Sequence, residues 1–570
     1  MSTKDSKTAL GPAPSTPAKA DRTVYNKKGH GAEQREKIAA LYDQLSGNVS
    51  AIARAMNLGR SAVRAHIQKM GKKKPLAGGT RSGVKEKKSD LPEKGGIKRY
   101  ILTSAQNNTF VNRRVWDALR QLANHYGAEI FVGTFSYNMN AYGPLAVKYG
   151  SESTRGSGSY DKEPWFDPSF KGHINDERVE LGKGLVWCGE MNILPTEENP
   201  LSGLETYTHR KSAIFPHAKM AMRSIATMQG EGTKFNYTTG TITLMNYIQK
   251  KAGLKAEHHH IYGGLLVEVD SEGHWWVRQV HVTKDGNLQD LDVKVEKGKL
   301  TTGNSVEAIT WGDLHATIAE PWVVRQSQDM LDTLKPKYQF LHDVMEGVST
   351  NRHVIKHAPD AHYGFYRWLR GLHRVDEEIT RTIDVIRKYL RPWCKTVVPD
   401  SNHDGWWLRS WLLRYDYRYD PANAELFLKL QNWFYEQTRE NVAKGLTHKE
   451  INVAEKAFDM YGLKKSEITF LLPDDSFTIC NRRIECGMHG HLGPNGKFGT
   501  PELLSKIGRK ANTAHTHSCG IYAGLYVAGT SSKLSWSYNE GPSSWSHSHI
   551  ITYPNGNRTI VTFWAGKWRA

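Results

Sequence analysis

The stretch Ala308-Ile309-Thr310-Trp311-Gly312-Asp313-Leu314-His315 decides the predicted fold of this chain. Its first four residues form an apolar run that predicts a buried strand. The strand ends at an Asp-x-His pair, which presents a carboxylate and an imidazole at a strand-to-loop corner. Because Asp-x-His often arises by chance, the pair gains meaning only from similar side chains later in the chain.

Four later stretches repeat these side-chain types: His342-Asp343, Ser401-Asn402-His403-Asp404, Met488-His489-Gly490-His491 and Ala514-His515-Thr516-His517. Two divalent cations that clamp a phosphodiester need a bridging carboxylate and several further ligands, with positions left open for water and substrate. The series therefore predicts a two-metal phosphoesterase centre. Mixed Asp, His and Asn ligands suit borderline metals such as manganese. The five scattered cysteines form no C-x-x-C pair, which argues against a cysteine zinc site.

The series resembles the motifs of the calcineurin-like metallophosphoesterases, which run Asp-x-His, Gly-Asp-x-x-Asp/Asn, Gly-Asn-His-Asp/Glu, a lone His in a Gly-rich turn, and Gly-His-x-His. The resemblance implies a two-metal β-sandwich flanked by helices. It implies two sets of metal ligands: Asp313, His315, Asp343 and His517 for one ion, and Asp343, Asn402, His489 and His515 for the other. The implied ions are two divalent cations, with Mn²⁺ expected first and Mg²⁺ or another divalent metal as the alternative.

The same resemblance gives His403 a catalytic role instead of a ligand role. His403 would face the scissile phosphate and stabilise the transition state or protonate the leaving oxygen. Four positions depart from the family motifs: His342 and Ser401 replace Gly, Glu346 replaces the second acid of the second motif, and Ala514 replaces Gly. The choice between His489 and His491 as the ligand is open.

Composition and local patterns divide the chain into five regions, of which the two largest are of α/β type. We expect a disordered tail at 1–30, a small all-α helix-turn-helix domain at 31–70, a basic flexible linker at 71–96, an α/β domain of unknown role at 97–304, and the metallophosphoesterase domain at 305–570 with a helical insert at about 405–463. No apolar run is long enough to span a bilayer, and the N-terminus has no signal-peptide core, so a cytoplasmic chain is expected.

The expected helix-turn-helix domain resembles the DNA-binding units of resolvases and phage regulators. Apolar positions such as Ile38, Ile52, Ala53 and Val63 face inward in this prediction. The residues expected to contact DNA lie on the third helix and at the start of the linker: Arg60, Ser61, Arg64, Gln68, Lys69, Lys72, Lys73 and Lys74. Arg and Gln can read base edges, whereas Lys and Ser can hold phosphates. The alternative is a small helical bundle for protein contacts.

Charge is concentrated in the same region. Residues 1–96 contain 20 Lys and Arg against 8 Asp and Glu, in a chain whose net charge is +19. A basic block on a nearly balanced body predicts a polyanion-binding arm, and double-stranded DNA is the expected partner. The alternative is a solubilising tail.

Residues 97–570, which open with Ile101-Leu102-Thr103-Ser104-Ala105-Gln106-Asn107-Asn108-Thr109, also resemble the host-DNA-degradation proteins of T-five-type bacteriophages. That resemblance implies a manganese-dependent DNase that acts in the infected cell's cytoplasm as a homo-oligomer. We therefore expect a hydrolase that cleaves DNA phosphodiesters. The alternatives are a metallophosphatase of nucleotides or phosphoproteins and a non-catalytic DNA-binding transfer or regulatory protein.

Overall fold

The computed structural model describes residues 36–42, 52–53, 55–58, 63, 84–137, 165–350, 361–414, 416–419, 421–536 and 539–570. The chain divides into a small unit, Met1–Val84, and a large unit, Lys85–Ala570. In the small unit, residues 36–42 are helical, and the four predicted inward positions Ile38, Ile52, Ala53 and Val63 are buried together. The expected tail and all eight expected DNA contacts, Arg60 to Lys74, lie outside the described residues, so the helix-turn-helix stays a prediction.

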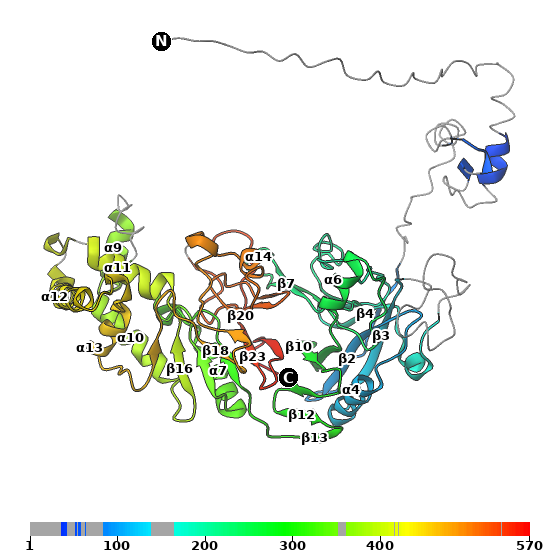
Figure 1. The fold of residues 1–570 in the computed structure, drawn as a ribbon, viewed down its shortest axis with the longest axis horizontal. Helices are drawn as coiled ribbons and strands as arrows, with labels where there is room; N and C mark the ends of the chain where they lie inside the picture. The colour runs from blue at the N-terminus through cyan, green and yellow to red at the C-terminus, as the bar shows by residue number, and fades with distance from the viewer. Residues whose placement is uncertain are drawn as a thin grey trace, which may run out of the picture. The chain divides into compact units, whose positions relative to one another are not determined.

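The large unit is a mixed α/β structure, which confirms the expected fold class (Figure 1). Its first layer is one sheet of 11 strands. In spatial order the strands are β1 (Glu86–Lys88), β4 (Arg178–Gly182), β5 (Leu185–Cys188), β6 (Ser212–Phe215), β8 (Lys234–Thr238), β7 (Met222–Ile225), β21 (Gly520–Tyr522), β22 (Leu525–Val527), β20 (Lys510–Thr513), β19 (Ile484–Glu485) and β18 (Thr478–Ile479).

Two sheets placed edge to edge form the second layer. One has four strands: β10 (Trp275–His281), β9 (Gly263–Asp270), β2 (Ile97–Gln106) and β3 (Glu129–Phe135). The other has six: β17 (Thr469–Phe470), β16 (Lys395–Val398), β15 (Tyr338–Phe340), β14 (Ala308–Thr310), β23 (Ser548–Thr552) and β24 (Arg558–Thr562). A small sheet consists of β11 (Leu288–Asp290), β12 (Val293–Glu296) and β13 (Lys299–Thr301).

The two layers bury a continuous apolar core between them. Side chains of β2 and β9, such as Leu102 and Val267, pack with Trp187 and Tyr237 of the 11-stranded sheet. The six-stranded sheet packs on the far end of the same layer, where Phe340 contacts the cluster around Ile484. The intervening residues of β2 and β9, such as Ile101 and Leu266, face the other way and are also buried, so the four-stranded sheet is covered on both faces.

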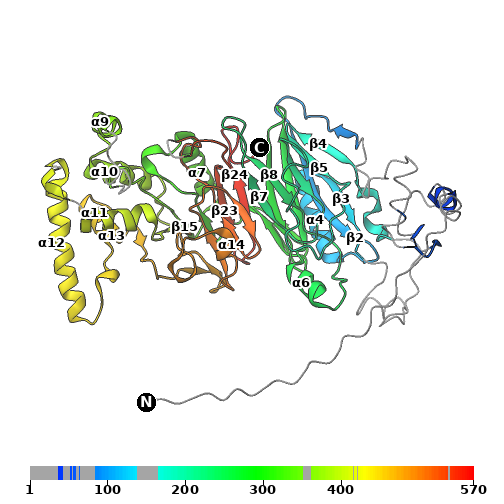
Figure 2. The ribbon, with the colours of Figure 1, turned by 90° about the horizontal axis from the view of Figure 1, so that it is seen from above.

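Helices cover the outer faces. The α-helices are α4 (Arg113–Tyr126), α6 (Lys251–His259), α7 (Pro321–Leu334), α9 (Ala361–Leu369), α10 (Val375–Arg387), α11 (Leu408–Arg414), α12 (Pro421–Ala443), α13 (Val453–Met460) and α14 (Pro501–Leu504). Helices α9 to α13 gather on the side of residues 305–570 that lies away from residues 97–304 (Figure 2). None of the described helices is long and apolar enough to cross a membrane.

Helix α4 shows why the sequence forms these elements. The Asn112 side chain accepts a hydrogen bond from the Val115 N–H and caps the first turn, and Gly127 ends the helix at φ 60°. Val115, Leu119 and Leu122 recur at helical spacing and are buried against the four-stranded sheet.

Residues 97–304 and 305–570 share one strand arrangement. Read outward from the centre of the 11-stranded sheet, β7-β8-β6-β5-β4 and β21-β22-β20-β19-β18 have the same chain order and the same parallel and antiparallel pairings. In the second layer, β10-β9-β2-β3 matches β24-β23-β14-β15 in the same way.

The two halves join along a seam that crosses both layers. Strands β7 and β21 pair antiparallel, with Met222 opposite Ile521. In the other layer β10 lies against β24: the Gln279 N–H donates to Thr559 Oγ1 at 2.9 Å, and the Ile560 N–H donates to Gln279 Oε1 at 2.8 Å. Both layers therefore continue from one half into the other.

The structure corrects two expectations about domain organisation. Residues 86–88, expected in the linker 71–96, form β1 and pair in parallel with β4, where Lys87 also forms an ion pair with Glu177. The expected boundary at 304/305 does not separate compact units, because strand pairing across the seam joins residues 97–304 to residues 305–570.

Candidate metal centre

The predicted ligands meet at one end of the sandwich because of strand direction. Strands β14, β15 and β16 are parallel, so the residues that come after them, Asp313, Asp343 and Asn402, emerge at the same edge. Strands β19 and β20 are also parallel, and His489 and His515 come after them from the other layer. Loops after parallel strands are the usual place for a binding site in α/β proteins.

A close approach of two backbones holds Asp313 in place. A Cβ added at Gly312 would lie 2.5 Å from the carbonyl carbon of Gly529, so only glycine fits there. The Asp313 N–H donates to Gly529 O at 3.1 Å, and the Ser531 N–H donates to Asp313 O at 2.7 Å. The His315 N–H donates to Asp343 O at 2.8 Å, which links the first two motifs through their backbones.

Four of the predicted ligands have left-handed backbones. Positive φ angles occur at His315 (41°), Asp343 (40°), His515 (75°) and His517 (56°). Such angles are uncommon in non-glycine residues, and each costs on the order of 1–3 kcal/mol. The surrounding hydrogen bonds must therefore hold these residues in place, and the strain turns their side chains toward one another.

The side-chain atoms fall into groups with metal-ligand spacing. His517 Nε2 lies 2.9 Å from Asp313 Oδ2 and 3.0 Å from His315 Nε2. Asp343 Oδ2 lies 3.2 Å from His489 Nε2 and 3.9 Å from His315 Nε2. The potential ligand atoms of Asp313, His315 and His517 lie within 4.8 Å of one another, as do those of Asp343, His489 and His515. Asp343 therefore stands between two histidine groups.

The unsatisfied polar atoms of this cluster fit divalent cations. Asp343 Oδ1, Asn402 Oδ1 and His517 Nδ1 are buried and have no hydrogen-bond partner in the part of the chain that the structure describes. Among the described residues, no Lys or Arg forms an ion pair with Asp313 or Asp343. Buried charges and polar groups without partners are costly. Bound cations would neutralise the charge of both carboxylates and be coordinated by these buried ligand atoms.

The histidine pKa values respond to the buried carboxylates. Burial opposes a charge on His489, but Asp343 and Asp313 outweigh it and raise the pKa of His489 to about 9. Burial likewise opposes a charge on His315, and Glu346 and Asp343 raise its pKa to about 10. For His491, burial and the nearby His489 outweigh Asp343 and lower its pKa to about 3. Negative potential is thus concentrated around Asp343.

Three further polar residues orient the cluster. His315 Nδ1 lies 2.9 Å from Glu346 Oε2, which leaves His315 Nε2 directed at the other ligands. Asp404 accepts the N–H groups of Val344 at 3.0 Å and Met345 at 2.8 Å, and Ser401 Oγ caps the Asp404 N–H at 3.0 Å. Sequence reasoning treated Glu346 and Ser401 as departures from a motif. The spacing of Glu346, three residues after Asp343, was the signal for its role.

His403 lies beside the ligands. Its Nδ1 is 2.6 Å from the Glu346 carbonyl oxygen, and its Nε2 is 3.9 Å from Asp343 Oδ2. The Trp407 ring packs against it with centroids 3.9 Å apart. Burial lowers the pKa of His403 although Asp343 opposes this.

The structure places His489 and His491 differently. His489 contacts Asp343, whereas His491 Nε2 lies 3.8 Å from Asp400 Oδ2 and lines a neighbouring cavity. His342, which stands where the motif has Gly, packs its ring on His489 with Nδ1 atoms 3.3 Å apart. Position therefore favours His489 over His491 as a ligand.

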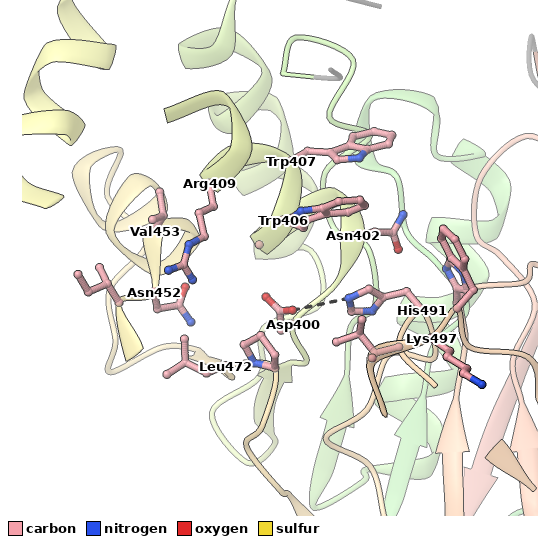
Figure 3. A pocket seen from close by; sticks show the side chains of 17 residues that line it. Asp400, Asn402, Trp406, Trp407, Arg409, Asn452, Val453, Leu472, His491 and Lys497 are labelled. Atoms are coloured by element: carbon pink, nitrogen blue, oxygen red, sulfur yellow. Dashed lines mark ion pairs between the residues drawn. The ribbon is translucent and has the colours of Figure 1, made fainter. Parts of the chain in front are cut away.

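A cavity of about 460 Å³ opens beside the cluster (Figure 3). Asn402 and His515 line it on the side of the predicted ligands. Trp406 and Trp407 come from the π-helix Asn402–Trp407 (labelled η3), and Leu492 and Phe498 come from the loop after β19. The cluster is therefore accessible from a largely apolar hollow.

No family model matches the chain. It is 35% identical over 524 residues to Protein A1 of Escherichia phage T5, an alignment that covers 87% of this chain and 89% of that protein. The chain belongs to the Protein A1 family. This match supports the expected likeness to proteins of T-five-type phages. The likeness extends over nearly the whole length of Protein A1. Membership of the calcineurin-like metallophosphoesterases stays a prediction.

Glu346→Gln tests the orienting role of Glu346. A neutral amide should hold His315 less firmly and lower Mn²⁺ affinity about 10- to 100-fold, as loss of such partners usually does. Isothermal titration calorimetry of the metal-free protein measures the change, with the exposed Glu425→Gln as the matched control. Equal affinities of Glu346→Gln and the control would contradict the assignment.

Proposed function

We propose that this protein is a divalent-metal-dependent phosphodiesterase that cleaves DNA. The observation that carries the proposal is the buried Asp and His cluster around Asp343, whose carboxylates pair with no Lys or Arg among the described residues and which opens into an aromatic cavity. Two packed sheets with the cluster at the carboxyl ends of parallel strands support a calcineurin-like two-metal sandwich.

The ligand assignment is based on the contacts. Asp313, His315 and His517 would hold one ion, and Asn402, His489 and His515 the other, with Asp343 bridging both. Two bound divalent ions, most simply Mn²⁺, would neutralise charge on the phosphate and activate a water for in-line attack. Glu346 and Asp404 keep the ligands in place before substrate arrives, so little reorganisation is needed during the reaction.

His403 is suited to assist the leaving group. Its Nδ1–H donates to the Glu346 carbonyl, which fixes the ring orientation and directs Nε2 toward the reacting side. Burial disfavours the imidazolium form of His403, so a second proton taken up on Nε2 would be readily donated to the leaving oxygen of the phosphodiester. Trp407 packs on the ring and restricts its rotation.

DNA is the proposed substrate because of three features. The N-terminal unit is strongly basic, the cavity beside the cluster is aromatic, and the related protein is phage-encoded. We propose that Arg60, Arg64 and the neighbouring basic residues bind double-stranded DNA, and that the protein degrades host DNA as a homo-oligomer in the cytoplasm of the infected cell. A phosphatase would instead turn over small phosphomonoesters and leave DNA intact.

Asp343→Ala tests the metal centre. Loss of the bridging carboxylate should lower the rate of plasmid cleavage in Mn²⁺ by roughly a thousandfold or more, while DNA binding through the basic arm persists. Gel assays with and without chelator measure cleavage, and a mobility-shift assay measures binding. The exposed Asp384→Ala on α10 is the matched control. Wild-type cleavage by Asp343→Ala would refute the two-metal proposal.

Removal of residues 1–84 tests the arm. The cut precedes β1, so the large unit keeps all its strands. Because a tethered arm raises the local DNA concentration, its loss should increase KM about tenfold or more and change kcat little. The salt dependence of KM should also weaken. Steady-state kinetics on linear DNA at two salt concentrations measures both effects, and an unchanged KM would show that the arm does not recruit substrate.

A further inference from the structure

We infer that the cavity beside the metal centre is a nucleobase subsite, which holds the base attached to the sugar next to the scissile phosphate. This inference rests on the proposed function. Asn402 and His515 belong both to the predicted ligand set and to the cavity wall. A phosphate at the cluster therefore places the neighbouring nucleoside at the mouth of the cavity.

The cavity walls suit a flat aromatic ring. Trp406 is 40% exposed and Phe498 is 84% exposed, although both are large apolar side chains. Ile451, Val453 and Leu472 add apolar side chains to the lining, of which Val453 and Leu472 are labelled in Figure 3. Exposed aromatic rings beside a phosphate-binding site are the usual means of stacking unpaired bases. The volume of about 460 Å³ is in the range of sites for small ligands.

Polar groups of the cavity are largely committed to the protein. The Arg409 guanidinium donates to the carbonyl of His448 at 2.6 Å. Asn452 Oδ1 accepts the Glu455 N–H at 2.9 Å, which caps α13. Asp400 lies 3.8 Å from His491. Lys497 and His491 Nδ1 also line the cavity, but stacking on the aromatic walls accepts any base, so the subsite imposes little sequence preference.

A base can enter this cavity only when it leaves the helical stack. The subsite therefore takes a base from a single-stranded end, a nick or a locally opened duplex. Unstacking is easiest at such places, which makes them preferred points of attack.

DNA that lacks one base tests the subsite. A single-stranded oligonucleotide with one tetrahydrofuran residue, end-labelled, is cleaved by the full chain in Mn²⁺, and the products are resolved at single-nucleotide resolution. Wild-type protein should cleave a phosphate next to the abasic residue about 5- to 100-fold less than the same phosphate in intact DNA. Even cleavage along the strand, or no cleavage of this strand by protein that cuts plasmid DNA, would overturn the subsite, whereas no cleavage of either DNA would overturn the proposed function itself.

Trp406→Ala and Phe498→Ala locate the effect. Each should reduce the discrimination against the abasic position, whereas Trp393→Ala, a similarly exposed tryptophan away from the cavity, should retain it. Ultraviolet cross-linking of 5-bromodeoxyuridine DNA to metal-free protein gives a readout independent of activity. Cross-links should map to the segment around Trp406 or Phe498, and cross-links confined to other segments would overturn the subsite.

A different observation supports a second inference: the structure assigns residues 97–304 as a metal-free copy of the fold that carries the centre. Besides sharing nine strands, the halves share a sequence pattern after β8 and β22. Tyr237-Thr-Thr-Gly-Thr-Ile-Thr243 matches Tyr526-Val-Ala-Gly-Thr-Ser-Ser532 in its Tyr, Gly, Thr and final hydroxyl positions.

The contacts of the two segments are the same. Thr530 Oγ1 donates to Asp313 O at 2.9 Å, and the Ser531 N–H donates to the same oxygen at 2.7 Å. In the first half, Thr241 Oγ1 donates to Ser104 O at 2.8 Å, and the Ile242 N–H donates to that oxygen at 3.0 Å. Ser104 therefore occupies the position of Asp313.

A second ligand position is also replaced. The His517 carbonyl accepts the Ser546 N–H at 3.1 Å, and the Ala218 carbonyl accepts the Ile261 N–H at 3.0 Å in the equivalent place. Serine and alanine thus stand where aspartate and histidine hold the proposed ion. Neighbouring amides of the first half bond within the protein, as when Gln106 Nε2 donates to Asn246 O at 3.0 Å.

Metal counting tests this assignment. The full chain, saturated with Mn²⁺ and desalted, should carry about two ions by elemental mass spectrometry, in line with one two-metal site. The double variant Asp313→Ala, Asp343→Ala should carry almost none. About four ions in the wild type, or two that remain in the double variant, would overturn the assignment.

Discussion

The crossing of two backbones at Gly312 and Gly529 is the constraint on which the centre depends. Neither position has room for a Cβ: one added at Gly312 would meet the Gly529 backbone at 2.5 Å, and one added at Gly529 would meet Ser546 O at 2.0 Å. The contact fixes the start of the Asp313 loop against the other layer. The backbone N–H and carbonyl of Asp313 are hydrogen-bonded to Gly529 and Ser531. These bonds fix the backbone of Asp313 and so the point from which its carboxylate emerges.

The residues of the candidate centre lower the stability of the folded protein. The centre gathers two buried carboxylates, several histidines and four left-handed backbones in one place, and each of these features costs free energy in the absence of cations. The compensation comes from around it: the buried sandwich core, the capped Asp404 loop and the Glu346 contact to His315. Strained residues that a rigid frame holds together are typical of sites organised before their ligand binds.

Local sequence patterns predicted a good part of this arrangement and missed the rest for a physical reason. The strand at 308–311 and the convergence of Asp313, Asp343 and His489 are consequences of periodicity and of the direction of parallel strands. Strand β1 and the β7–β21 pairing were not predictable, because their partners lie far away in the sequence and nothing local marks them. The role of Glu346 required knowing which way His315 turns.

The order of strands in the six-stranded sheet has a consequence for when the proposed centre can assemble. Strand β14 carries the first ligands, yet its antiparallel neighbour β23 is among the last strands synthesised, and the Gly312 N–H donates to His549 Nδ1 at 2.9 Å. A nascent chain that has not yet emerged beyond residue 552 lacks this neighbour. The loop that carries Asp313 and His315 thus lacks part of its frame until residue 552 has been synthesised, so the proposed centre is completed only near the end of translation.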